Sequence, residues 1–150
     1  MLNNIGIVKA YFAAERSKSL DNIASFLSDD FQLLGMGSKP LDKTVWLGFL
    51  SLLKTALSNI KIKMTDIQSQ GSIVSLTEHL TGMHTGTFDL TVFGLPPVPA
   101  SGRTFVFPTV LWEVTVVDGK IMQLNDVTPP SPDSGIPGLL QALGVTMSNV

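Results

Sequence analysis

The chain has no cysteine, and charged residues make up only 15% of its 150 residues. The absence of cysteine excludes disulfides, thiolate metal ligands and a cysteine nucleophile. Globular domains usually carry charge on about a quarter of their residues, so this composition leaves more apolar surface than a water-exposed monomer needs. A lined cavity, a buried dimer face, or both would account for the excess.

The net charge of −2 gives no electrostatic case for nucleic acid or an anionic membrane as a partner. The two histidines and the scattered acids show no metal-ligand spacing, so we expect no metal site. The first residues lack the basic flank of a signal peptide, and the apolar runs are too interrupted to span a bilayer. We therefore expect a soluble cytoplasmic protein, folded as a single domain over residues 1–150.

Helical periodicity comes first along the chain, and strand periodicity follows. Apolar spacing predicts helices over 5–14, 20–27 and 41–57, with N-caps at Asn3 or Asn4, Ser19 and Asp42. Period-two alternation predicts strands over 31–34, 60–69, 73–87, 103–117 and 121–127, and a terminal helical turn is expected in 136–143. Helices followed by strands favour the α+β class over α/β.

The last two strands meet at Asp118-Gly119, a dipeptide that favours the positive-φ turn of a tight hairpin. Side-chain alternation then predicts that Met122, Leu124 and Asp126 share one face. An acid at the end of an apolar stripe either lies in water, capping the strand end, or faces a pocket. In a pocket, desolvation would raise the pKa of the Asp126 carboxyl and suit it to proton transfer.

Four motifs occur in an order that is typical of one group of proteins. They are His84-Thr85-Gly86-Thr87-Phe88, then Gly94-Leu95-Pro96 with Ser101-Gly102-Arg103, then Asp118-Gly119-Lys120-Ile121, and the tail Gly138-Leu139-Leu140-Gln141-Ala142-Leu143-Gly144. On these residues the chain resembles the SnoaL-like polyketide cyclases and their ester cyclase relatives, in the nuclear transport factor two-like superfamily. The resemblance extends over roughly residues 5–144.

The resemblance implies an α+β cone, in which a curved mixed or antiparallel sheet wraps around the N-terminal helices and encloses a pocket. It also implies a homodimer through the outer sheet face, and acid/base proton transfer without a cofactor on a hydrophobic carbonyl small molecule. Asp126 would be the acid/base in this chain. The relatives usually carry a tryptophan just before this aspartate and often a second aspartate about three residues beyond; Asn125 and Pro129 stand there. The alternative is a non-catalytic module of the same fold that binds a small molecule or another protein.

Three further side chains are candidates for the chemistry. His84 and Glu78 share a strand face because their separation is even, and with Asp126 they would form an acid/base cluster. His84 is otherwise a surface histidine at a strand end. Glu113, between Trp112 and Val114, is either a second pocket acid or part of the outer, dimer-forming face.

Aromatic and apolar side chains supply candidates for the pocket wall. Trp46 and Trp112 would stack on a flat ligand, and the alternative is that they are ordinary core residues. Phe49 lies on the same helical stripe as Trp46, and Met122 and Leu124 lie on the strand that ends at Asp126. The predicted ligand-binding set is therefore Trp46, Phe49, Trp112, Met122 and Leu124.

Overall fold

The computed structural model describes residues 3–16, 19–36, 39–89, 91 and 96–129. Within these residues, three helices and seven strands follow one another along the chain. Their bounds are α1 (Asn4–Glu15), α2 (Leu20–Ala24), β1 (Leu27–Leu34), β2 (Leu41–Asp42), α3 (Lys43–Ala56), β3 (Leu57–Gln70), β4 (Ile73–His84), β5 (Thr104–Val106), β6 (Val110–Val117) and β7 (Lys120–Asp126). The α+β class is confirmed.

Each helix begins at a cap that the sequence predicts. A side-chain oxygen of the cap accepts a hydrogen bond from a free backbone N–H in the first turn: Asn3 from Gly6 (2.7 Å), Ser19 from Asn22 (3.2 Å) and Asp42 from Val45 (2.9 Å). Replacing such a cap by alanine typically costs about 1 kcal/mol. Local chemistry therefore fixes where α1, α2 and α3 start.

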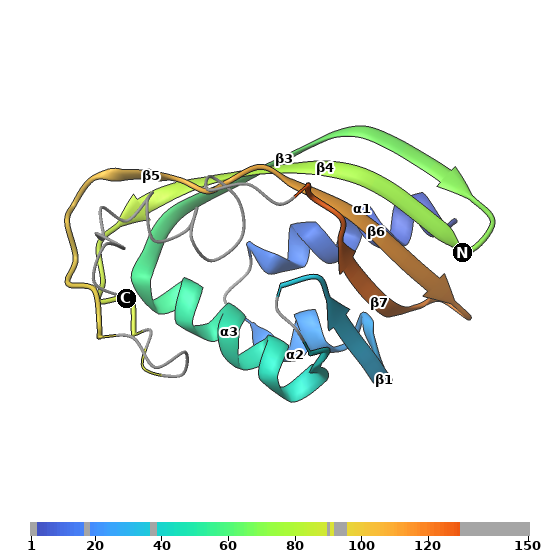
Figure 1. Ribbon diagram of the computed structural model, residues 1–150, viewed down its shortest axis with the longest axis horizontal. Helices are drawn as coiled ribbons and strands as arrows, with labels where there is room; N and C mark the ends of the chain where they lie inside the picture. Colours follow the sequence, from blue (N-terminus) through green and yellow to red (C-terminus); the bar gives the residue numbers. More distant parts are fainter. Residues whose placement is uncertain (1–2, 17–18, 37–38, 90, 92–95, 130–150) are drawn as a thin grey trace.

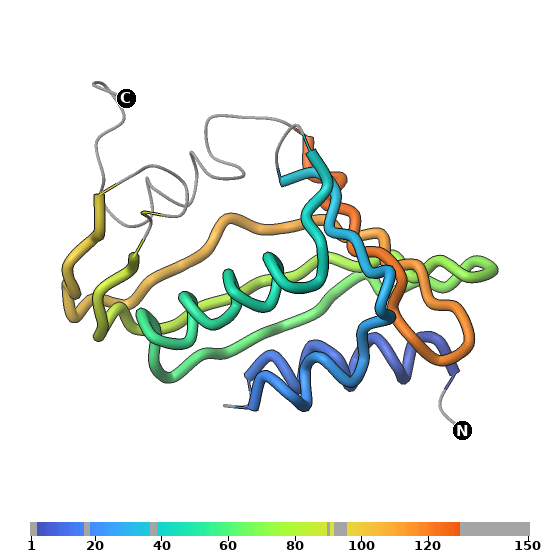
Figure 2. Tube along the Cα trace, turned by 90° about the horizontal axis from the view of Figure 1, so that it is seen from below, coloured from blue at the N-terminus to red at the C-terminus, as the bar shows by residue number. Residues whose placement is uncertain are grey.

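The strands form one curved, mixed sheet in the order β2-β1-β7-β6-β4-β3, with β5 paired to β4. β1 runs parallel to β7, and the other described pairs are antiparallel. The long strands β3 and β4 arch over the helices, which lie on the concave side of the sheet (Figure 1). Seen at right angles, α1 and α3 both run along the length of these strands (Figure 2).

The predicted strand over 103–117 is wrong as a continuous element, because it divides into β5 and β6. Both pieces pair with the same edge of β4, through Thr81↔Val106 and Glu78↔Val110. The interruption contains Pro108, which has no N–H to donate to a ladder. The N–H of Phe107 still donates to the carbonyl of Leu80 in β4 at 3.0 Å, so the ladder is interrupted at Pro108 and not before it.

Other predicted bounds also shift. The second helix ends at Ala24, since β1 already begins at Leu27, which is earlier than predicted. The strand over 73–87 ends at His84, because the N–H groups of Thr85 and Gly86 both bond to the carbonyl of Ala56. The helical turn expected in 136–143 lies outside the described residues.

The prediction that Met122 shares a face with Leu124 and Asp126 is corrected by a bulge. The pairing of β6 with β7 shifts between Thr115 and Val116, so that Met122 is an extra residue in β7. Ile121 is therefore buried together with Leu124, and Met122 is only half-buried. The positive φ angles of Asp118 (51°) and Gly119 (78°) confirm the hairpin turn.

The core lies between the helices and the inner face of the sheet. Alternation directs Val74 and Leu76 of β4, Val114 of β6 and Leu124 of β7 to this face, and each is at most 3% exposed. The next residue of β4 on the same face is Glu78. The alternation that builds the core therefore also places a carboxyl group inside the protein.

Gly35 follows β1 and lies against the end of β7. Its φ is +91°, and a Cβ at this position would overlap the backbone carbonyl of Asp126. Glycine is required here both for the backbone angle and for the space.

We predict that Gly35→Ala lowers the free energy of unfolding more than Gly71→Ala. Both glycines have positive φ, but a Cβ at Gly71 (φ +61°) meets nothing within 4 Å. The left-handed conformation costs alanine about 1–2 kcal/mol at either site, and overlap at Gly35 adds about 1–3 kcal/mol. Urea unfolding of both variants measures the difference, and equal losses would contradict the close approach of Gly35 to Asp126.

Candidate functional site

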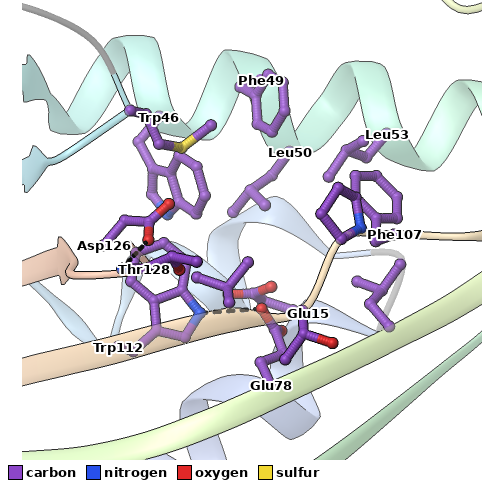
Figure 3. Close-up of a pocket in the computed structure, with 15 residues that line it drawn as sticks. Glu15, Trp46, Phe49, Leu50, Leu53, Glu78, Phe107, Trp112, Asp126 and Thr128 are labelled. Carbon is purple, nitrogen blue, oxygen red and sulfur yellow. Dashed lines mark hydrogen bonds between the residues drawn. The ribbon is translucent and has the colours of Figure 1, made fainter. Parts of the chain in front are cut away.

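A pocket opens between α3 and the inner face of β4 and β6 (Figure 3). Its cavity volume is about 80 Å³. Trp46 and Phe49 of α3, Phe107 of the segment between β5 and β6, and Trp112 of β6 supply aromatic walls. Thr109 also lines the pocket and is exposed, so the cavity reaches the surface there. The pocket is therefore apolar and small, with access to solvent.

Three carboxyl groups from three different elements line this pocket among the described residues: Glu15 of α1, Glu78 of β4 and Asp126 of β7. They are far apart in sequence, and the fold brings them to one cavity. In Figure 3 the side chains of Glu15 and Glu78 lie close together, and Asp126 lies on the other side of Trp112. The pocket therefore holds a pair of acids and a separate third acid.

Glu78 is 6% exposed. Its Oε1 accepts a hydrogen bond from Nε1 of Trp112 at 3.0 Å, while its Oε2 is buried without a hydrogen-bond partner. Burial raises the pKa of Glu78 to about 7; the Trp112 hydrogen bond opposes this rise, and the charge of Asp126 adds to it. Near neutral pH this carboxyl can therefore either give or take a proton.

Glu15 is the last residue of α1, and its Oε2 is also buried without a hydrogen-bond partner. Burial raises the pKa of Glu15 well above its usual range, and the nearby charge of Glu78 raises it further. A hydrogen bond with the Tyr11 hydroxyl and the charge of Lys54 oppose this rise. Glu15 and Glu78 thus each disfavour ionisation of the other.

A hydrogen-bonded chain joins Glu15 to the pocket wall. Nε1 of Trp46 donates to the Tyr11 hydroxyl at 2.9 Å, and that hydroxyl is hydrogen-bonded to Glu15. Burial raises the pKa of Tyr11 well above its usual value, so Tyr11 stays a neutral donor. The position of Glu15 is therefore tied to an aromatic ring that lines the pocket.

Asp126 is the last residue of β7 and pairs directly with Trp112 of β6. Its Oδ1 accepts a hydrogen bond from the backbone N–H of Thr128 at 3.0 Å. The residue is half-buried, and it is the pocket acid on the side of Trp112 away from Glu15 and Glu78 (Figure 3).

Five of the sequence-predicted site residues line the pocket: Asp126, Glu78, Trp46, Phe49 and Trp112. Leu124 does not, because it is fully buried in the core, and the bulge in β7 turns Met122 away. The two tryptophans are buried, so they belong to the core as well as to the pocket wall. The ligand-binding role of the lining residues stays a prediction.

His84 and Glu113 lie elsewhere. His84 shares the inner face of β4 with Glu78, but six residues at about 3.3 Å each place it ~20 Å along the strand. It is 2% exposed, so it is not a surface histidine, and its Nδ1 lies 3.3 Å from the Ser101 hydroxyl. Glu113 points to the opposite sheet face, where it borders a shallow hollow with Ser75 and Gln68. Neither side chain lines the pocket.

Sequence reasoning missed Glu15, although the sequence holds a signal for it. α1 ends on this acid, with no acidic residue in its first turn and no basic residue in its last. The carboxyl end of a helix carries partial negative charge, so an acid there is disfavoured unless something else requires it. An acid at that end of a largely apolar helix is the signal that the sequence holds.

Neither a membrane-spanning helix nor a metal-binding cluster is found in the residues that the structure describes. No helix there is both long and apolar enough to cross a membrane. No group of three or more histidine or acidic side chains in the same residues is arranged to hold a metal ion.

No family model matches this chain, and no curated protein does so either. Solved structures do match. AclR, a proposed hydroxylase from Streptomyces galilaeus, superposes with a TM-score of 0.74 at 19% identity, over 94% of this chain and 80% of its own. IdmH, a proposed polyketide cyclase from Streptomyces antibioticus, gives 0.70 at 23% identity, over 96% and 100%. A proposed SnoaL-like polyketide cyclase from Jannaschia gives 0.67 at 16% identity, over 85% and 93%.

These similarities confirm the predicted resemblance at the level of the fold. The chain shares the curved-sheet fold of these solved structures, one of which is described as a proposed SnoaL-like polyketide cyclase. At identities below a quarter the similarity establishes the fold and not the reaction.

We predict that the free energy of unfolding of the protein decreases as pH rises from about 4.5 to about 7. The pKa of Glu78 is about 7 in the folded state and 4.5 is its ordinary value, so the folded state binds more protons in this window. The stabilisation is full below pH 4.5 and is lost as pH rises through 7, by on the order of 3 kcal/mol from Glu78. Glu15, whose pKa is also raised, contributes in the same direction.

Glu78→Gln should flatten this pH dependence in urea unfolding. Glu113→Gln is the matched control, since the same change is made on the opposite sheet face, and it should keep the slope of the wild type. An unchanged slope in Glu78→Gln would show that this carboxyl titrates as it does in water.

Proposed function

We propose that this protein is a cofactor-independent acid/base catalyst for a small apolar molecule that carries a carbonyl group. The observation that supports it is the meeting of Glu78 and Asp126, from two different strands, in one pocket with aromatic walls. Proton transfer beside a carbonyl needs one group to take the α-proton and another to stabilise the developing oxyanion. The pocket offers two such groups on opposite sides of Trp112.

Asp126 takes the base role in this proposal. It removes the α-proton, the electron pair of the broken C–H bond forms the enol double bond, and the carbonyl oxygen gains the proton of Glu78. Return of both protons, at the same or another carbon, completes an isomerisation or a proton exchange. In an aldol closure the enol carbon instead attacks a second carbonyl carbon of the same molecule. The enol O–H returns its proton to Glu78 as the first carbonyl re-forms, and the proton on Asp126 passes to the new alkoxide.

Glu78 suits the acid role for a physical reason. Burial holds its pKa at about 7, so a large fraction of the carboxyl is protonated at neutral pH. A protonated carboxyl in an apolar wall is uncharged, and it can donate a hydrogen bond to the substrate oxygen. The Trp112 indole, at 3.0 Å from Oε1, holds the carboxyl in place.

A non-catalytic binding module of the same fold is the second candidate function. The hydrogen bond from the Thr128 N–H to Asp126 favours it, because such a bond is an ordinary way to end a strand. Asn125 and Pro129, where the SnoaL-like relatives usually carry tryptophan and often aspartate, favour it too. One activity measurement separates the two functions.

We predict that the wild type accelerates exchange of the α-protons of cyclopentanone with D₂O, as followed by proton NMR. Asp126→Asn should slow the enzymatic exchange by about 10²–10⁴-fold, the usual contribution of a general base. Glu113→Gln changes an acid outside the pocket and should keep the wild-type rate.

Circular dichroism would check that both variants fold. Exchange in Asp126→Asn at the wild-type rate would remove the base role of Asp126. No acceleration by the wild type, with cyclopentanone shown to bind, would favour the binding module.

A homodimer through the outer face of the sheet is part of the proposal. The low charge content supports it, as do Ile73 and Val117, which are 39% and 43% exposed on β4 and β6. We predict that sedimentation velocity at micromolar concentration shows a dimer and that Ile73→Lys weakens it, because a buried lysine would have to be desolvated. A monomer alone in the wild type would contradict the dimer.

A further inference from the structure

The ionisable side chains found in the pocket lining are acidic. Among the described residues that line the pocket, three carry a carboxyl group and none is lysine, arginine or histidine. An ionised carboxyl group only accepts hydrogen bonds. Where one of these acids is ionised, a ligand that completes the lining must bring donors, positive charge, or both.

Two carboxyl oxygens in this lining lack a hydrogen-bond partner. Oε2 of Glu78 is buried, in a side chain that is 6% exposed, and Oε2 of Glu15 is buried as well. A buried acceptor without a donor destabilises the folded protein. Such oxygens beside a cavity point to a ligand that donates to them.

The charged and titratable groups of the neighbouring elements do not supply that donor. From α3, Nζ of Lys54 bonds to the backbone carbonyl of Glu15 at 2.9 Å. From α1, the Tyr11 hydroxyl is bonded to Glu15, and from β7 Asp126 adds a further acid. The ion pair found in the described residues, Lys43 with Asp29, lies outside the pocket lining. The charge of the acid pair is therefore not balanced by an ion pair in this part of the chain.

Aromatic rings surround the same cavity. Trp46 and Phe49 are stacked, with ring centroids 5.6 Å apart and planes at 19°. Trp112 meets Trp46 edge-on at 6.4 Å and 70°. The faces of such rings attract a cation, most strongly the face of Trp and most of all when the cation is desolvated.

We propose that the ligand of this pocket carries a cationic amine, held by Glu15 and Glu78 among the rings of Trp46 and Trp112. The proposal deepens the proposed function and rests on it, because it assigns the substrate to apolar carbonyl compounds that bear an amine. Glu15 supplies the opposite charge, and Glu78 keeps the proton that it donates to the substrate oxygen.

The charge balance fits a single ammonium group. Two adjacent carboxyls that share one proton carry one negative charge. A tertiary ammonium would donate its N–H to a free carboxyl oxygen, and a quaternary one would rely on charge and ring faces. Burial raises the pKa of Glu15 and so favours its protonated form in the empty pocket, and binding of a permanent cation favours release of that proton. The affinity for such a cation therefore increases with pH.

Tetramethylammonium and tert-butanol test the proposal, because they are similar in shape and only one is charged. Trp46 and Trp112 are the two tryptophans of the chain and both line the pocket, so intrinsic fluorescence reports binding. At about pH 8 we expect the cation to bind roughly tenfold or more tightly than the alcohol, with potassium chloride as the salt control. At about pH 6 the affinity for the cation should be roughly tenfold lower than at pH 8. At the lower pH a larger fraction of the Glu15 and Glu78 carboxyls is protonated and must lose a proton before the cation binds.

Glu15→Gln should reduce the affinity for tetramethylammonium by about tenfold or more and leave that for tert-butanol unchanged. Glu113→Gln, on the opposite face, should change neither. Equal binding of the two probes by the wild type at about pH 8 would overturn the amine assignment, and that measurement needs no variant.

The binding measurement and the exchange measurement can fail separately, so failure of the amine proposal is distinguishable from failure of the proposed reaction. Exchange of cyclopentanone protons that depends on Asp126, without a preference for the cation, would keep the reaction and remove the amine. A preference for the cation that depends on Glu15, without exchange, would keep the amine ligand in a binding module.

Discussion

The burial of the Glu78 carboxyl on the inner face of β4 is the constraint on which the site depends. Removing an ionised carboxyl from water costs several kcal/mol, and one hydrogen bond from the neutral Trp112 indole does not offset that cost. The group therefore keeps its proton to higher pH. Its raised pKa follows from the same apolar walls that stabilise the fold, so in the proposed function the packing of Trp46 and Trp112 also sets the acidity of Glu78.

Two irregularities in the sheet shape the pocket around this carboxyl. The break at Pro108 interrupts the ladder on one edge of β4, and Phe107, Pro108 and Thr109 then line the cavity beside Glu78. The bulge in β7 lets Ile121 and Leu124 both face the core, with Asp126 next on that face. If the sheet were regular over these residues, its wall would have no opening beside Glu78. The side chains at one end of β7 would then point to the opposite face of the sheet.

Local signals in the sequence predicted the elements well, and long-range pairing decided the rest. Caps at Ser19 and Asp42 and the Asp118-Gly119 turn depend on neighbours within three residues, and all three are found. Alternation put Glu78 and His84 on one strand face, and both are buried. It could not tell that His84 lies a long way from the pocket, because that depends on where α3 crosses the sheet. The bulge at Met122 depends on how β7 pairs with β6, so the sequence of β7 alone does not predict it.

Glu15 shows why a site can be harder to predict than a fold. Its position at the end of α1 is unfavourable twice, since the helix end is partly negative and the carboxyl lies next to that of Glu78. Groups that cost stability where they lie are typical of functional sites. A cavity of about 80 Å³ is roughly half the size of one that holds benzene. In the proposed function, a larger ligand would insert only a small head group between the aromatic walls and leave the rest toward Thr109. The head group is the part that meets Glu15 and Glu78, so its charge, more than the size of the whole molecule, determines what this pocket selects.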